Sequence, residues 1–132
     1  MTTTRFLDLY AVSGPDEGMR YSIEEGTYRI IAKRENDRIL NPDQLEIIYL
    51  HIKTYSDNSR LKFQKRGPDI LLNDLSVARM HVMVLMDELN ISISELSSAD
   101  KIRVNGNPIK AAIIKEGDLI TIGNTKLMAL IG

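Results

Sequence analysis

Histidine is the residue type best suited to acid–base chemistry in this sequence. One of the two histidines, His81, opens an apolar run within LLNDLSVARMHVMVLM, residues 71–86. A catalytic histidine needs a nucleophile or a carboxylate within hydrogen-bonding reach. The other histidine, His51, stands in a different segment, and the chain has no cysteine and no Gly-x-Ser-x-Gly sequence. Because no nucleophile, base and orienting group can be combined, the sequence argues against an enzyme and favours a structural role for His81.

Cations and hydroxyls suggest a second kind of chemistry, the binding of an anion. Lys33 and Arg34 end an apolar segment, and Arg79 stands two residues before His81. Lysine binds phosphate as a point charge, whereas arginine offers a planar fork of donors. Ser76 supplies a hydroxyl in the same polar turn as Arg79. Arg79 fits two interpretations equally well, a contact to an acidic or phosphorylated ligand and a solvated loop residue.

Length and composition limit the classes of protein. The chain has 132 residues, enough for one domain with a core, and 43% of them are apolar. No apolar run approaches the roughly 18 residues of a membrane helix, so we expect no membrane insertion by this domain. The N-terminus lacks the pattern of a secretory signal, and the absence of cysteine fits a reducing compartment. We therefore expect a cytoplasmic domain without a metal site or a cofactor.

A basic segment runs from Lys53 to Arg66. It reads as a solvated face or as a site for an anion or a partner. Nucleic-acid binding through this segment would fall steeply with salt. The formal net charge of −1, two phenylalanines and no tryptophan leave little for phosphate neutralisation or base stacking. We therefore expect no nucleic-acid partner.

Short strands between turn signals dominate the chain, which predicts a β-sandwich. The Asn105–Gly106 pair predicts a hairpin turn in which both residues have positive φ. We see no internal repeat in the sequence. The predicted strands are Arg5–Val12, Met19–Ile23, Thr27–Ala32, Asp69–Leu72, His81–Asp87, Ile91–Glu95, Leu119–Ile122 and Lys126–Ile131, with an extra strand possible at Arg60–Lys65.

The segment 35–68 interrupts this pattern and reads as an insertion after the third strand. Asn41, Pro42 and Asp43 resemble the start of a helix, and the next residues place Leu45, Ile48, Tyr49 and Ile52 on one helix face. The isoleucines equally favour strands, so an inserted helix and an inserted hairpin both stay open. The segment is too apolar for plain disorder, and we expect it to pack on the sandwich or to present an interaction surface.

Five motifs in order resemble the forkhead-associated (FHA) family, whose members are β-sandwiches that read phosphothreonine. The motifs are YRIIAKR (28–34), DILLND (69–74), VARMH (77–81), ELSSADKIRVNG (95–106) and EGDLITIG (116–123). The resemblance covers nearly the whole chain except about 30 residues after Arg34, and it is ungapped from Asp69 to Gly106. It implies one FHA-like domain over residues 1–132, an all-β sandwich of two antiparallel sheets (SMAD/FHA type).

The departures from the family pattern fall on the positions that hold the ligand. The family's loop serine, which bonds the phosphate, falls on Ala78, and its peptide-holding asparagine falls on Asp100. The Gly-Thr pair that follows falls on Lys101 and Ile102. The family's strand-end arginine falls on Lys33 or, with a one-residue shift, on Arg34. Losing a hydrogen bond to a charged group costs about 1.5–3 kcal/mol, roughly a tenfold to hundredfold loss of affinity.

The resemblance therefore implies a non-catalytic protein-interaction module whose phosphothreonine recognition is lost or weakened. The alternative is a phosphopeptide reader with a rearranged pocket, in which Ser76 replaces the missing hydroxyl. His81 matches the family histidine that braces the binding loop. The candidate ligand-binding residues are Lys33, Arg34, Ser76, Arg79, Ser98, Asp100 and Lys101.

The expected partner is a protein that binds through a phosphothreonine-containing or an acidic peptide. By family analogy we expect the N-terminal or regulatory part of a bacterial signalling or secretion protein. Because the chain ends at Gly132, directly after the last predicted strand, we expect a domain of a longer protein, with a complete small adaptor as the alternative.

Overall fold

The computed structural model describes residues 5–34, 65–77, 82–87, 90–96 and 102–132. Every regular element in these ranges is a strand. The strands are β1 (Phe6–Ser13), β2 (Arg20–Glu24), β3 (Thr27–Lys33), β4 (Lys65–Arg66), β5 (Ile70–Leu72), β6 (Val82–Met86), β7 (Ile91–Glu95), β8 (Ile102–Val104), β9 (Asn107–Ile109), β10 (Ala111–Ile113), β11 (Leu119–Ile122) and β12 (Thr125–Ile131). The sequence prediction of an all-β fold is thereby confirmed.

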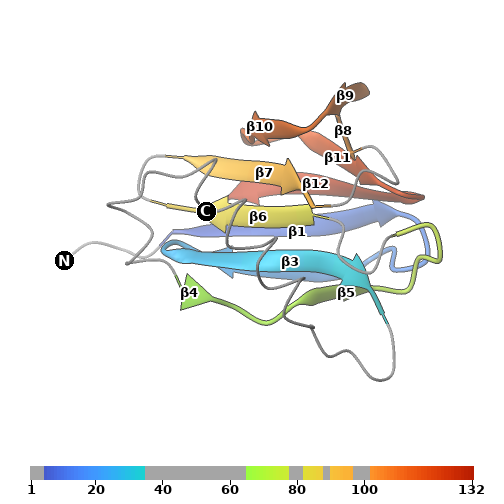
Figure 1. Cartoon of the computed structure of the whole chain (residues 1–132), viewed down its shortest axis with the longest axis horizontal. Coiled ribbons are helices and arrows are strands. Elements are labelled where there is room, and N and C mark those ends of the chain that lie inside the picture. Colours follow the sequence, from blue (N-terminus) through green and yellow to red (C-terminus); the bar gives the residue numbers. More distant parts are fainter. Residues whose placement is uncertain (1–4, 35–64, 78–81, 88–89, 97–101) are drawn as a thin grey trace.

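The strands form two sheets that pack face to face (Figure 1). The first sheet has the order β2-β1-β12-β11-β8-β9. The second has the order β10-β7-β6-β3-β4, and β5 also pairs with β3. The chain therefore starts and ends in the first sheet, where Leu9 of β1 lies opposite Ala129 of β12.

Two pairings in the second sheet are parallel, which corrects the expectation of purely antiparallel sheets. Thr27 and Tyr28 of β3 pair with β4 in parallel, and Ile31 of β3 pairs with Ile70 of β5 in the same sense. A parallel pair needs a crossover of a dozen or more residues, which a hairpin cannot supply. The long segment between β3 and β5 supplies that length.

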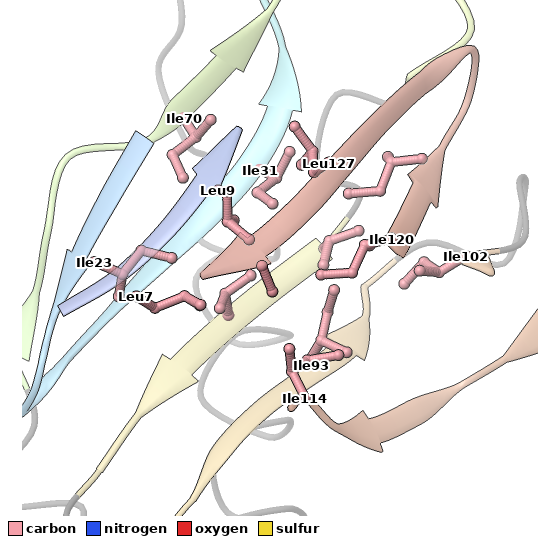
Figure 2. Close-up of a cluster of buried hydrophobic side chains, with 14 of the residues drawn as sticks. Leu7, Leu9, Ile23, Ile31, Ile70, Ile93, Ile102, Ile114, Ile120 and Leu127 are labelled. Atoms are coloured by element: carbon pink, nitrogen blue, oxygen red, sulfur yellow. The ribbon is translucent and has the colours of Figure 1, made fainter. Parts of the chain in front are cut away.

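The core lies between the sheets and is made of alternate residues of the strands. Leu7 and Leu9 of β1 and Ile120 of β11 come from one sheet, and they pack against residues such as Ile31 and Ile93 of the other (Figure 2). All five are fully buried. Burial of such side chains contributes about 1.5–3 kcal/mol each. This alternation is the pattern from which the sandwich was predicted.

A second, smaller cluster lies on the other face of the β3–β6 pair. Ile30, Ala32 and Met83 are fully buried there, while their neighbour Ile31 belongs to the main core. Tyr28, Leu71 and Leu96 pack against this cluster. Both faces of β3 are therefore buried from Ile30 to Ala32, just before the strand ends at Lys33.

All eight firmly predicted strands are present, with ends that shift by at most one residue. The Asn105–Gly106 turn is also confirmed, because φ is +52° at Asn105 and +85° at Gly106. The sequence reading gave no bounds for β8 and β9, the two arms of this hairpin, and it missed β10; each has three residues, too few to show alternation. Of the predicted insertion, residues 35–64 lie outside the described residues, and so do the helix and hairpin predicted there. Its described end contributes β4.

Candidate functional site

Three loops or turns and the end of one strand lie at the same end of the sandwich. They are the β1–β2 turn, the end of β3 at Lys33 and Arg34, the loop 73–77 after β5, and the β11–β12 turn at Gly123 and Asn124 (Figure 1). In the FHA resemblance this is the end that holds the ligand. We call it the loop end.

The buried carboxylate of Asp74 organises the loop end. Its Oδ1 accepts hydrogen bonds from the Ser76 amide at 2.9 Å and the Ser76 hydroxyl at 2.5 Å. Its Oδ2 accepts from the Asn124 amide and the Thr125 hydroxyl, each at 2.8 Å. Asp74 is 1% exposed, and four donors satisfy it. One side chain therefore joins the loop after β5 to the turn before β12.

These bonds make Asp74 a stronger acid than an ordinary aspartate. Burial by itself raises the pKa of Asp74, but the hydrogen bonds from Ser76, Thr125 and Asn124 outweigh it, and the net pKa is lowered. A carboxylate that accepts several hydrogen bonds is stabilised in its charged form. Asp74 is therefore an anionic anchor at neutral pH.

Gly123 permits the close approach of the two loops. Its φ is +60°, and a Cβ placed there would meet the hydroxyl of Ser76 at an impossible distance. The same Cβ would lie 3.1 Å from Asp74 Oδ2 and from Val77 Cγ2. The β11–β12 turn thus needs a residue without a side chain because the loop 73–77 occupies that space.

A second carboxylate ties the β1–β2 turn to the same loop. The Asp16 carboxylate accepts from the backbone amide and the side-chain amide of Asn73, both at 2.7 Å. Asp16 is 8% exposed. Burial raises the pKa of nearby Tyr21, Asp16 raises it further, and Arg34 opposes them. Asp16, Tyr21 and Arg34 are therefore close enough to interact electrostatically.

The end of β3 brings its two cations beside the loop. The Arg34 amide donates to the Leu72 carbonyl at 2.8 Å, and Lys33 is the parallel partner of Leu72. Lys33 is half-buried and Arg34 is exposed. Within the described part of the chain neither side chain forms an ion pair. Both remain able to attract an anion at the loop end.

Of the seven candidate ligand-binding residues, the structure places Lys33, Arg34 and Ser76 together at the loop end. Arg79, Ser98, Asp100 and Lys101 lie outside the described residues, as does His81, so their roles stay predictions. The Ser76 hydroxyl is already engaged, since it donates to Asp74 and accepts from the Asn124 amide at 3.0 Å.

Asp74 and Asp16 are the loop-end residues that the sequence reading did not single out. An Asp-x-Ser sequence after a strand is a signal for a side-chain-capped turn, and Asp74-Leu75-Ser76 carries it. Asp16 has no such local signal, because its partner Asn73 is far away in sequence.

The described residues hold neither a metal cluster nor a membrane-spanning helix. No group of three or more His, Cys, Asp or Glu gathers in the described ranges to hold a metal ion. In the same ranges no helix is long and apolar enough to cross a membrane.

The family model described as "Inner membrane component of T3SS, cytoplasmic domain" matches residues 64–130, just over half of the chain. The chain belongs to this family. Solved structures of FHA domains share its fold. The FHA domain of an Arabidopsis thaliana hypothetical protein aligns with a TM-score of 0.66 at 19% identity, over 95% of this chain and 84% of that one.

A second similar structure belongs to a protein of a secretion system. The cytoplasmic domain of the T3SS sorting platform protein PscD from P. aeruginosa aligns with a TM-score of 0.58 at 14% identity, over 93% of this chain and 78% of that one. Among curated proteins, the glycogen accumulation regulator GarA of Mycobacterium tuberculosis is 30% identical over 64 residues, 48% of this chain and 40% of GarA. The match thus spans less than half the length of that relative.

Proposed function

We propose that this chain is a non-catalytic protein-interaction module that binds a protein partner through its loop end, with phosphothreonine recognition lost or weakened. The observation that carries the proposal is the hydrogen bond from the Ser76 hydroxyl to Asp74. A hydroxyl has one proton to donate. Ser76 therefore cannot donate to a phosphate without giving up Asp74, and the family's own serine position holds Ala78.

Asp74 also opposes a phosphate electrostatically. A ligand phosphate that bound the Ser76 hydroxyl would lie beside the Asp74 carboxylate, whose lowered pKa keeps it charged. Two like charges at such a short distance repel each other, most strongly where burial limits screening. This is a further reason to assign Ser76 a structural role in the loop.

The loop keeps surface that suits a partner without a phosphate. Leu75 is 85% exposed, so its side chain is available for an apolar contact with a partner. It stands between Asp74 and Ser76, whose bonds hold the turn rigid. An apolar contact on this turn, at the same end of the sandwich as the cations Lys33 and Arg34, fits an acidic or apolar peptide segment.

The comparisons support the class of function. The matched family is named for a cytoplasmic domain of a secretion component, and GarA is named as a regulator. By analogy, this chain serves in the cytoplasm as the regulatory or docking part of a bacterial secretion or signalling protein.

A phosphopeptide reader with a rearranged pocket is the second candidate. Lys33 and Arg34 favour it, because within the described residues they lie at the loop end without an ion-pair partner. Their attraction to a phosphate would be electrostatic and would weaken with added salt.

The deciding experiment is a titration of the domain with a degenerate phosphothreonine peptide library and with its unphosphorylated twin. We expect no binding tighter than millimolar that depends on the phosphate. Micromolar, phosphate-dependent binding by the unmodified chain would overturn the proposal and establish the second candidate.

The variant Ala78→Ser sharpens the titration, because it returns the hydroxyl at the family's serine position. We expect phosphate-dependent affinity to rise about tenfold to hundredfold. Ala111→Ser is a matched control, since it makes the same change at an exposed position of β10, away from the loop after β5, and it should leave the phosphate-dependent affinity unchanged. Equal affinities for Ala78→Ser and the unmodified chain would show that the missing hydroxyl is not what limits recognition.

A further inference from the structure

The four edge strands of the two sheets, as far as the structure describes them, differ in how they discourage pairing with another chain. Edge strands are normally protected by charges, by proline or by shortness. Strand β2 carries Arg20 and Glu24, β9 contains Pro108, and β4 is the basic pair Lys65–Arg66. Strand β10 has the sequence Ala-Ala-Ile, with neither a charge nor a proline.

The backbone of β10 has hydrogen-bonding groups that face outward. Ala112 lies opposite Ile93 of β7, and the flanking bonds run from the Glu95 amide to the Lys110 carbonyl and from the Ile114 amide to the Ile91 carbonyl. In an antiparallel ladder only alternate residues bond to the same neighbour. The amides and carbonyls of Ala111 and Ile113 therefore point away from β7, and no strand pairs with them in the described chain.

A groove of about 230 Å³ runs along the β7–β10 pair beside this edge. Its lining includes the small residues Ser92, Ser94 and Ala111, together with Ile113. Ser94 is 2% exposed, and its hydroxyl makes no hydrogen bond within the described part of the chain. Ile113 is 57% exposed. The edge thus combines unused backbone groups, a cavity over small side chains and one large exposed side chain (Figure 1 shows β10 beyond β7).

We propose that β10 is a self-association edge, which pairs antiparallel with β10 of a second copy of this chain. A two-fold axis at Ala112 places Ala111 opposite Ile113 of the second copy, and Ile113 opposite Ala111 of the second copy. These are the two residues with outward amides and carbonyls, so this register uses all of them in four hydrogen bonds. An axis at Ala111 or at Ile113 would use only the groups of one residue.

The side chains of β10 fit the same register. Ala111 and Ile113 lie on the groove side of the strand, because they pair with Ser94 and Ser92. In the paired edges Ile113 of the second copy comes next to Ala111, where the groove over Ser94 is open. A large side chain thus meets a small one at both pairs, which is the complementarity that packing across strands requires.

The contact is small. A three-residue edge buries far less than the roughly 1,200 Å² of a stable interface, so the association is weak and reversible. Lys110 and Lys115 flank the strand, and pairing brings lysines of the two copies near each other. Salt screens this repulsion, so association strengthens as salt is added. An acidic peptide on the same edge would show the opposite dependence.

Disulfide trapping tests the register, because the chain has no cysteine and each variant then carries one thiol. In the proposed pair, residue 112 faces its own copy across a non-hydrogen-bonded site with a Cα–Cα distance of about 4.5 Å, whereas residue 111 lies about 8 Å from its counterpart. A disulfide requires less than about 7 Å. Under mild oxidation we expect Ala112→Cys to form covalent dimer at least tenfold faster than Ala111→Cys.

Adding Ala111→Pro to Ala112→Cys should lower the rate of cross-linking to that of Ala111→Cys. Proline removes an outward amide that β7 does not use, so the fold tolerates it. Circular dichroism and thermal unfolding verify that each variant is folded. Sedimentation of the cysteine-free chain at rising concentration, with and without Ala111→Pro, gives a second measurement. Equal cross-linking at 111 and 112, or a mass independent of both concentration and Ala111→Pro, overturns the proposal.

Discussion

The hydroxyl of Thr125 donates a buried hydrogen bond to the carboxylate of Asp74, 2.8 Å away, although 51 residues separate them in the chain. Thr125 begins the last strand, β12, and is itself fully buried. Asp74 belongs to the loop that follows β5. The bond therefore joins the start of an interior strand of the first sheet to the loop that follows β5 of the second sheet. Loop order and global stability are coupled through this one carboxylate.

The stability of the domain should depend on pH through Asp74. Its folded-state pKa is lowered, so its contribution is complete above the ordinary aspartate pKa of about 3.9 and is lost as the pH falls through the folded-state value. Asp74→Asn should cost about 3 kcal/mol at neutral pH, because an amide cannot accept from all four donors. Urea unfolding of both proteins between pH 7 and pH 3 measures this.

The Asp74→Asn protein should also lose less stability on acidification than the unmodified chain. Asp118→Asn is the control, because Asp118 also accepts hydrogen bonds but is more exposed, and its replacement should cost less than 1 kcal/mol. Parallel pH profiles for Asp74→Asn and the unmodified chain would contradict the assignment of the acid sensitivity to Asp74.

Gly123→Ala should destabilise the loop end by about 1–3 kcal/mol. The new methyl group would be forced against Ser76, so the loop 73–77 must move or the turn must change its φ of +60°. Gly117→Ala is the matched control, since Gly117 has φ +86° with nothing within 4 Å of the added Cβ. The control carries backbone strain without the contact. Thermal unfolding should show the larger loss at position 123, and an equal loss would mean that the contact with Ser76 carries no energy.

Arg29 should resist replacement even by lysine. Its Nε donates to the Pro68 carbonyl at 2.6 Å and its Nη1 to the Ser22 carbonyl at 2.7 Å, so one guanidinium joins β3 to β2 and to the connection between β4 and β5. Burial lowers the pKa of Arg29 and Asp69 opposes this. A lysine cannot make both bonds in this geometry. We expect Arg29→Lys to cost about 1–2 kcal/mol, and the exposed Arg103→Lys almost nothing, in urea unfolding.

The fold was predictable because its signals are local. Alternation in segments such as Phe6–Ser13, and the Asn105–Gly106 turn, each specify a strand or a hairpin within a few residues. The parallel pairing of β3 with β5 was not predictable in this way, because it depends on which strands become neighbours after a long connection. Strands β8, β9 and β10 could not be delimited from the sequence, because three residues cannot display a period of two.

The loop end was only partly predictable for a related reason. The motif spacing led to Lys33, Arg34 and Ser76, and the structure places them at one end of the sandwich. The role of Ser76 depends on a long-range contact that the sequence does not reveal, because the Asn124 amide that donates to its hydroxyl comes from another turn. A sequence pattern records that a hydroxyl is present and does not record that its proton is already donated.

The cation that faces a phosphate can be identified once the hydroxyl is restored. In the Ala78→Ser protein, Arg34→Gln or Lys33→Gln should reduce affinity for the phosphothreonine library about tenfold, because a charged hydrogen bond is lost. Lys115→Gln is the control, since its turn follows β10 at the other end of β11, and it should have no effect. The position with the larger loss is the family's strand-end cation. If neither neutralisation lowers the affinity while Ala78→Ser binds phosphate, the cations at the end of β3 do not contact the ligand.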